Sequence, residues 1–142
     1  MRTYLTNECS FELEEAFADH TVHALQARID DDVDVGLWLS RELLPDGRTL
    51  RDAVSACVAE RGSRLDDYRV LDEREGEVAG VRVIELSARF RDGDVVVHER
   101  QAHFTASRVW YCLWARADFG QRAVCDRVID HVLPTLRFRE AD

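Results

Sequence analysis

The sequence lacks lysine altogether, so all 19 of its basic residues are arginine, and these are outnumbered by 28 acidic residues. The resulting net charge of −9 argues against nucleic acid and anionic membranes as partners, because binding to either depends on clustered cations. The sequence also lacks any apolar run near the ~20 residues that span a bilayer. Its N-terminal stretch, MRTYLTNECS, contains no hydrophobic signal core. We therefore expect a cytoplasmic protein that does not insert directly into a membrane.

Cysteine, proline and glycine are all scarce, and no catalytic or metal-binding motif is present. The four cysteines form no CxxC pair and are widely separated: Cys9, Cys57, Cys112 and Cys125. This spacing predicts reduced thiols rather than a disulfide framework. The five histidines and the acidic run Asp30–Asp32 match neither zinc nor EF-hand spacing, and no nucleophile elbow or phosphate-binding loop is found. We expect no metal, no cofactor and no enzymatic activity.

The chain has 142 residues, the length of one domain, and its periodicity predicts an α+β fold. Alternating patterns predict strands over residues 2–6, 10–13, 21–29, 33–41 and 68–78, before three more within residues 81–117. One helix is expected to start at Thr49, which caps it together with Asp52. A second is expected from Phe119 to Leu133, ended by Pro134 and followed by a short strand over residues 135–138. This order predicts a single domain, residues 1–142, in which a mostly antiparallel sheet carries the two main helices on one face.

Residues 81–117 organise the predicted sheet. Turns at Asp92-Gly93 and at residues 106–108 divide them into three strands, and the first turn places Glu85 across from Arg100. This register puts Gln101 on a face with Ile84, Leu86, Ala88, Phe90, Val95, Val97, Trp110, Cys112 and Trp114. The other face is apolar as well: Val83, Val96, Ala102, Phe104, Val109, Tyr111 and Leu113. A sheet that is apolar on both faces needs a cover on each. The helices supply one cover, and the question for function is what supplies the other.

Several short motifs, taken in order along the chain, resemble a known family. They are Tyr4–Glu8, Asp19–Val22, Leu39–Glu42 with Leu44–Gly47, Tyr68–Leu71 and, most specific, His98–Ala102 in the central strand. Together they resemble the Eag chaperones of type VI secretion, a DcrB-related family with a PsbP-like α/β fold. The resemblance covers nearly the whole chain.

The resemblance implies a function and a site. Members of that family are dimeric cytoplasmic adaptors that bind the N-terminal transmembrane segments of PAAR- or Rhs-type effectors and help to load them on the VgrG spike. The client-binding positions that it implies here are Val22, Ala24, Leu37, Leu39, Val58, Leu65, Val97 and Gln101. The chain departs from the family pattern at Cys57, which stands about where a polar amide is often found. It departs also at Trp38, Trp110 and Trp114, which are bulkier than expected and can reshape the groove for a different client.

Alternatives stay open for the site and for the function. Taken without the resemblance, Gln101 reads as an amide at the edge of the core, and the apolar site positions read as ordinary core. The alternative function is a PsbP-like adaptor that binds a folded protein partner without catalysis, and this predicts no affinity for apolar peptides. A small-molecule enzyme or carrier would need a closed pocket with converging polar groups, for which the sequence offers no motif.

Overall fold

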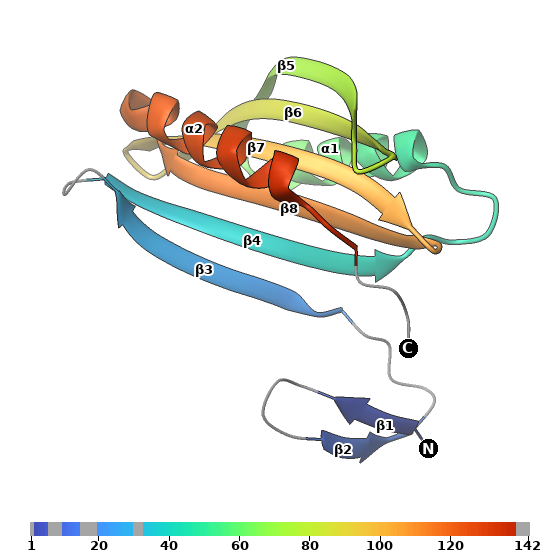
Figure 1. Cartoon of the computed structure of the whole chain (residues 1–142). Helices are drawn as coiled ribbons and strands as arrows, with labels where there is room; N and C mark the ends of the chain where they lie inside the picture. Colours follow the sequence, from blue (N-terminus) through green and yellow to red (C-terminus); the bar gives the residue numbers. More distant parts are fainter. Residues whose placement is uncertain (1, 6–9, 15–19, 30–32, 139–142) are drawn as a thin grey trace.

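The computed structural model describes residues 2–5, 10–14, 20–29 and 33–138, and the acidic run Asp30–Asp32 and Cys9 lie outside this part of the chain. A six-stranded sheet with the order β3-β4-β8-β7-β6-β5 forms the body of the protein (Figure 1). Its strands are β3 (Val22–Ile29), β4 (Val33–Leu43), β5 (Asp66–Val78), β6 (Val81–Asp92), β7 (Val95–Ala106) and β8 (Val109–Asp118). All five pairings are antiparallel, as predicted. A separate two-stranded sheet, β1 (Arg2–Leu5) with β2 (Ser10–Leu13), lies apart from this body near the N-terminus.

The β6–β7 hairpin follows a register shifted by two residues from the predicted one. Asp92 pairs with Val95, so the loop is Gly93-Asp94, and Gly93 takes the first loop position with a φ of 61°. Glycine is preferred at this first position in two-residue hairpin loops. Glu85 consequently pairs with Ala102, although its carboxylate still reaches the Arg100 guanidinium at 2.8 Å. A shift of two residues leaves every side chain on its predicted face, because side chains alternate with a period of two.

The two helices lie on opposite faces of the sheet, so the prediction that both cover one face is wrong. Helix α1 (Leu50–Arg64) packs Leu50 and Val54 against Ile84 and Leu86. Helix α2 (Arg122–Val132) belongs to the core cluster on the other face: Val33, Val35, Val83, Ala102, Phe104, Leu113, Ala115, Ala117, Cys125, Ile129 and Leu133. Figure 1 shows α2 in front of the sheet and α1 behind it. Because β6, β7 and β8 are apolar on both faces, each face needs a helix of its own.

The C-terminal segment packs on the core without pairing to the sheet, so the prediction of a last strand over residues 135–138 is also wrong. Helix α2 is flanked by two short 3₁₀ turns, η1 (Phe119–Gln121) and η2 (Leu133–Thr135). After η2, Leu136 and Phe138 lie against the core cluster on the α2 face. Phe138 meets the Phe104 ring edge-on, with centroids 5.8 Å apart. Two apolar anchors thus hold this segment in place of ladder hydrogen bonds.

A capping box starts α1, as predicted. The Thr49 hydroxyl accepts from the Asp52 backbone N–H at 3.1 Å, and the Thr49 N–H donates to the Asp52 carboxylate at 2.9 Å. We expect Thr49→Ala to lower the free energy of unfolding by about 1 kcal/mol. Ser55→Ala, at an exposed mid-helix position, is the control and should change it by less than about 0.5 kcal/mol. Urea denaturation of both variants tests this prediction. If the two substitutions lowered the free energy of unfolding equally, the Thr49 cap would not stabilise the helix.

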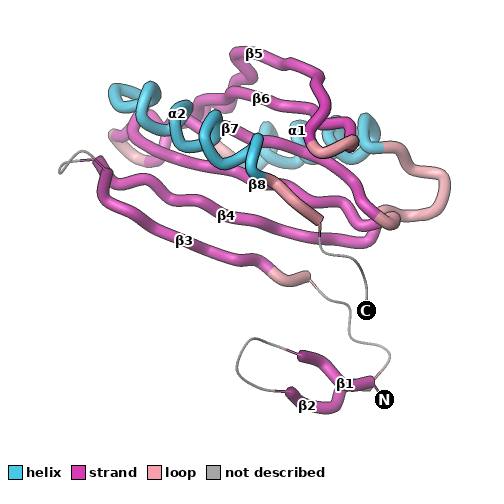
Figure 2. Tube along the Cα trace, in the orientation of Figure 1, coloured by secondary structure: helices cyan, strands magenta, loops and turns pink. Residues whose placement is uncertain are grey.

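Strand β3 extends beyond both helices. All of β3 except its last residue is exposed, including Val22 at 53% and Leu25 at 60%. The tube in Figure 2 shows β3, at the edge of the sheet, standing clear of α1 and α2. The two helices therefore cover the central strands of the sheet, whereas apolar surface at its β3 edge stays open on both faces.

Candidate functional site

A trough lies on the α1 side of the outer strands, which we call the α1-side trough. Register places the following trough residues on one face: Val22, Ala24, Trp38, Ser40, Trp110, Cys112 and Trp114. Helix α1 forms the wall of the trough. A pocket of about 420 Å³ opens between this wall and the floor, lined by Ser40, Glu42, Ala56, Cys57, Glu60, Arg61, Trp110, Cys112 and Trp114. Two tryptophans flank small residues here, so the pocket can accept bulky apolar groups.

Trp38 shapes the floor of the trough. Its ring lies over Gly36, two residues earlier on β4, so closely that a Cβ at position 36 would fall 2.1 Å from the ring. The ring also contacts Trp114 on the neighbouring strand, with centroids 5.1 Å apart. Glycine permits this close approach because it has no side chain. The absence of a side chain at one position therefore lets a large aromatic side chain lie flat at another.

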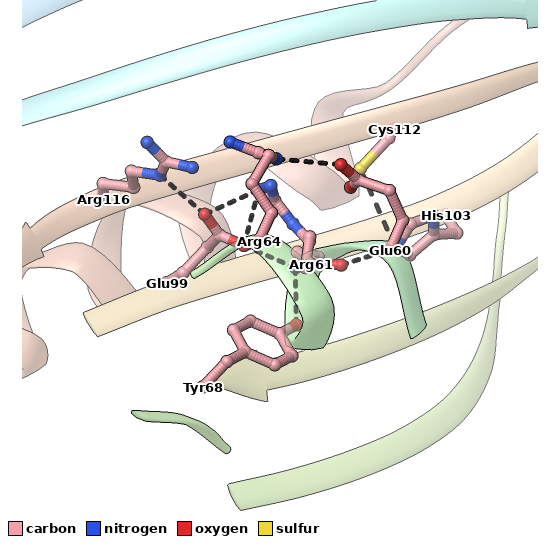
Figure 3. A network of polar contacts seen from close by, with 9 residues as sticks. Glu60, Arg61, Arg64, Tyr68, Glu99, His103, Cys112 and Arg116 are labelled. Atoms are coloured by element: carbon pink, nitrogen blue, oxygen red, sulfur yellow. Dashed lines mark hydrogen bonds and ion pairs between the residues drawn. The ribbon is translucent and has the colours of Figure 1, made fainter. Parts of the chain in front are cut away.

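A buried charge network lies beneath the trough and links α1 to the sheet (Figure 3). The Glu99 carboxylate, with no solvent exposure, accepts from Arg61 of α1 at 2.8 Å and from Arg116 of β8 at 2.6 Å. Both guanidiniums also lie over the Trp114 ring, 4.7 Å and 4.6 Å from its centroid. One carboxylate thus pairs with two guanidinium groups, and the aromatic ring contributes cation–π attraction to both.

The network continues along β7 as a chain of hydrogen bonds. The indole N–H of Trp110 donates to Nδ1 of His103 at 3.1 Å, so Nε2 carries the proton and donates to Oε1 of Gln101 at 2.7 Å. The Gln101 amide then donates to Glu99 at 2.5 Å and to the Tyr68 hydroxyl at 3.4 Å. Gln101 has no solvent exposure. Its donors and its acceptor are used inside the protein, and no polar group of Gln101 is left for a partner.

Burial sets the protonation of the groups around the trough. It lowers the pKa of His103 to about 4, with a further contribution from Arg61, so this imidazole is neutral at pH 7. Burial also raises the pKa of Tyr68 to about 12, helped by Glu99. The pKa values of the Cys57 and Cys112 thiols are raised by burial as well. Both thiols are therefore protonated at neutral pH, which makes them poor nucleophiles.

The structure divides the client-binding positions that the sequence implied. Val22, Ala24, Val97 and Gln101 share the α1 face of the sheet, while Val58 lies on α1 and Leu65 caps it. Leu37 and Leu39 lie on the other face, packed against the core cluster beneath α2. One face of the sheet therefore cannot present all eight positions, because Leu37 and Leu39 lie on the face opposite the other sheet positions. The physical reason is the alternation of β4, which turns Trp38 toward the trough and its two neighbours away.

A second polar cluster ties α2 to its face of the sheet. Arg100, 3% exposed, bonds the carboxylates of Glu85, Asp126 and Asp130 at 2.8, 3.3 and 3.2 Å. His98 also approaches Asp126 at 2.8 Å. These contacts fix α2 to the sheet. Within the described residues, no group of three or more His, Cys, Asp or Glu side chains is arranged so that it could hold a metal ion, and the cysteines at positions 57, 112 and 125 are free thiols. No helix in the described part of the chain has the length and hydropathy of a membrane span.

The fold is shared with three solved proteins of low sequence identity. PA94 from Pseudomonas aeruginosa, a protein of unknown function, superposes with a TM-score of 0.83 over 99% of both chains at 13% identity. The PsbP protein CyanoP of Synechocystis sp. PCC 6803 superposes with a TM-score of 0.54 at 15% identity. The match covers 86% of this chain and 76% of CyanoP. LpqN of Mycobacterium tuberculosis, involved in cell envelope biogenesis, superposes with a TM-score of 0.50 at 10% identity. The match covers 82% of this chain and 83% of LpqN. The predicted PsbP-like α+β architecture is confirmed by these likenesses.

Sequence comparison assigns the family. None of the curated proteins matches the chain. The model of the family named DcrB matches residues 8–111, which include β3, β4, α1, β5, β6 and β7. These elements build most of the α1-side trough and most of the charge network beneath it. The match spans well over half of the chain, and the protein is therefore a member of the DcrB family.

Proposed function

We propose that this protein is a cytoplasmic, homodimeric chaperone that shields an apolar N-terminal transmembrane segment of a type VI secretion effector of the PAAR or Rhs type. The bound effector would then be passed to the VgrG spike. The client segment would lie in the α1-side trough, and the chain would act by binding alone. This proposal takes its effector class from the motif resemblance and its binding surface from the geometry.

The observation that carries the proposal is the uncovered apolar surface beside α1. Val22 and Ala24 are exposed there next to the tryptophan-lined pocket. Exposed apolar surface of this kind, bordered by polar residues, commonly marks a binding site. Removing about 400 Å² of apolar area from water contributes on the order of 10 kcal/mol before the costs of association are subtracted. A trough of this type can therefore hold an apolar helix that would otherwise aggregate in water.

Two substitutions on one strand test the surface. Val22→Asp places a charge in the trough, and we expect it to abolish co-purification with the apolar segment of an effector, because the bound client would bury that charge unpaired. Leu25→Asp is the matched control, at a position of similar exposure that faces the other side of β3. It should retain the client. Since both positions are exposed, both variants should melt within a few degrees of the wild type.

The outcomes separate three interpretations. Loss of the client in Leu25→Asp alone would move the client to the other face, where Leu25 lines an apolar groove of about 480 Å³ with Leu37, Leu39 and Leu136. If both variants lose the client and light scattering shows that their oligomeric state has changed, client binding depends on the dimer. Retention of the client in both variants, or failure of the wild type to bind any apolar segment, would favour an adaptor for a folded partner.

A further inference from the structure

Two carboxylates stand at the mouth of the pocket in the α1-side trough. Glu42 comes from β4 and Glu60 from α1, so they approach the pocket from its floor strand and from its wall. Their side chains are 50% and 59% exposed. Glu42 has a 3.6 Å contact with His20, and Glu60 an exposed pair with Arg64. Both are thus accessible, and exposed pairs of this kind exchange readily with new partners.

The cation in the pocket lining is buried, whereas these two carboxylates are exposed. Arg61 lines the same pocket but is 6% exposed and bonded to the buried Glu99 carboxylate. A ligand that enters the pocket therefore meets apolar walls within and negative charge at the entrance. The net charge of −9 for the whole chain extends the same field. Clefts edged by charge of one sign concentrate partners of the opposite sign.

We propose that the pocket selects an apolar segment that carries lysine or arginine next to its apolar part, with the apolar side chains between Trp110 and Trp114 and the basic group against Glu42 and Glu60. Basic residues commonly flank membrane-spanning segments, so the chemistry of such clients matches both parts of the site. This inference rests on the proposed function, and it adds to it a requirement on the partner.

Two peptides with a common apolar core test the requirement. Each has fourteen leucine and alanine residues in the same order, with two lysines at both ends in one peptide and two glutamates in the other. Binding is followed by protein tryptophan fluorescence, because Trp110 and Trp114 line the pocket and the peptides contain no tryptophan. In 50 mM salt we expect the lysine peptide to bind about tenfold more tightly, and 0.5 M salt should reduce this preference to about twofold.

Variants locate the effect. Glu42→Gln and Glu60→Gln should each weaken binding of the lysine peptide about two- to fivefold and leave the glutamate peptide equal or tighter. Glu77→Gln is the matched control, because it removes the same charge from an exposed position on the distant strand β5. It should leave both affinities unchanged.

The failures are distinguishable. Equal binding of both peptides by the wild type would overturn the basic-flank requirement and leave the proposed function intact. An effect of Glu77→Gln as large as that of Glu60→Gln would overturn it too, because overall charge would then be the cause. If neither peptide binds, the proposed function fails, and the requirement fails with it.

Discussion

Glu99→Gln is expected to lower the free energy of unfolding by about 3–5 kcal/mol. The substitution keeps the size of the side chain but removes the only carboxylate that Arg61 and Arg116 share in this network. Both guanidiniums would then stay beneath the trough without a counter-charge, and the new amide would direct hydrogens at the Gln101 amide. Because Arg61 belongs to α1, the loss should also loosen the helix from the sheet.

Glu75→Gln provides the control for this prediction. Glu75 likewise pairs with two arginines, Arg51 at 2.6 Å and Arg82 at 2.8 Å, yet its side chain is 45% exposed. Water and salt screen such a pair, so the variant should unfold close to the wild-type midpoint. Urea denaturation of the two variants compares them directly. Similar stabilities would mean that burial of the Glu99 network has no energetic weight, contrary to the structure.

Acidification is expected to destabilise the protein through His103. The folded-state pKa of about 4 lies below the ordinary value of 6.5, so between these values the unfolded chain binds a proton that the native chain does not. The contribution of His103 to the free energy of unfolding is therefore fully present above pH 6.5. It is lost as the pH drops from 6.5 to about 4, and its size is on the order of 3 kcal/mol. The proton would also place an N–H on Nδ1, opposite the indole N–H of Trp110, and break the hydrogen-bond chain.

His103→Gln separates this contribution from that of the carboxylates. The variant cannot take up the proton, so its stability should decrease less than that of the wild type between pH 7 and pH 4, whatever its stability at pH 7. His23→Gln, at an exposed position on β3, should keep the wild-type slope. Chemical denaturation at a series of pH values measures the slopes. Parallel curves for His103→Gln and the wild type would contradict the assignment.

Period-2 alternation predicted strands β1–β8, and it placed the side chains of the central strands on their correct faces, because a side chain changes face only when the register moves by an odd number of residues. It also predicted a strand over residues 135–138 that does not form. The predicted hairpin register was wrong by two residues, because Gly93 can take either position of a two-residue loop and alternation does not distinguish the two placements. Alternation did not determine which face each helix covers, and the prediction that both helices lie on one face was wrong. The apolar stripes of α1 and α2 show that each packs against something, but the central strands offer apolar residues on both sides.

The buried network had a visible signal that sequence reasoning did not use. Residues 98–101 and His103 are polar in what was already predicted to be the central strand. Polar groups at such a position must find partners, so the pattern predicts a network on each face. The identity of the partners could not be predicted, because any of 19 arginines could have served. The placement of Gln101 on a client surface came from the family resemblance, whereas in the structure its amide is bonded to Glu99, Tyr68 and His103.

The contact between Gly36 and Trp38 means that substitutions at these two positions of β4 depend on each other. A side chain at position 36 requires the indole to leave its place, and loss of the indole removes the need for glycine. Substitution at one position is therefore neutral only on certain backgrounds at the other. The depth of the trough floor is therefore set jointly by positions 36 and 38.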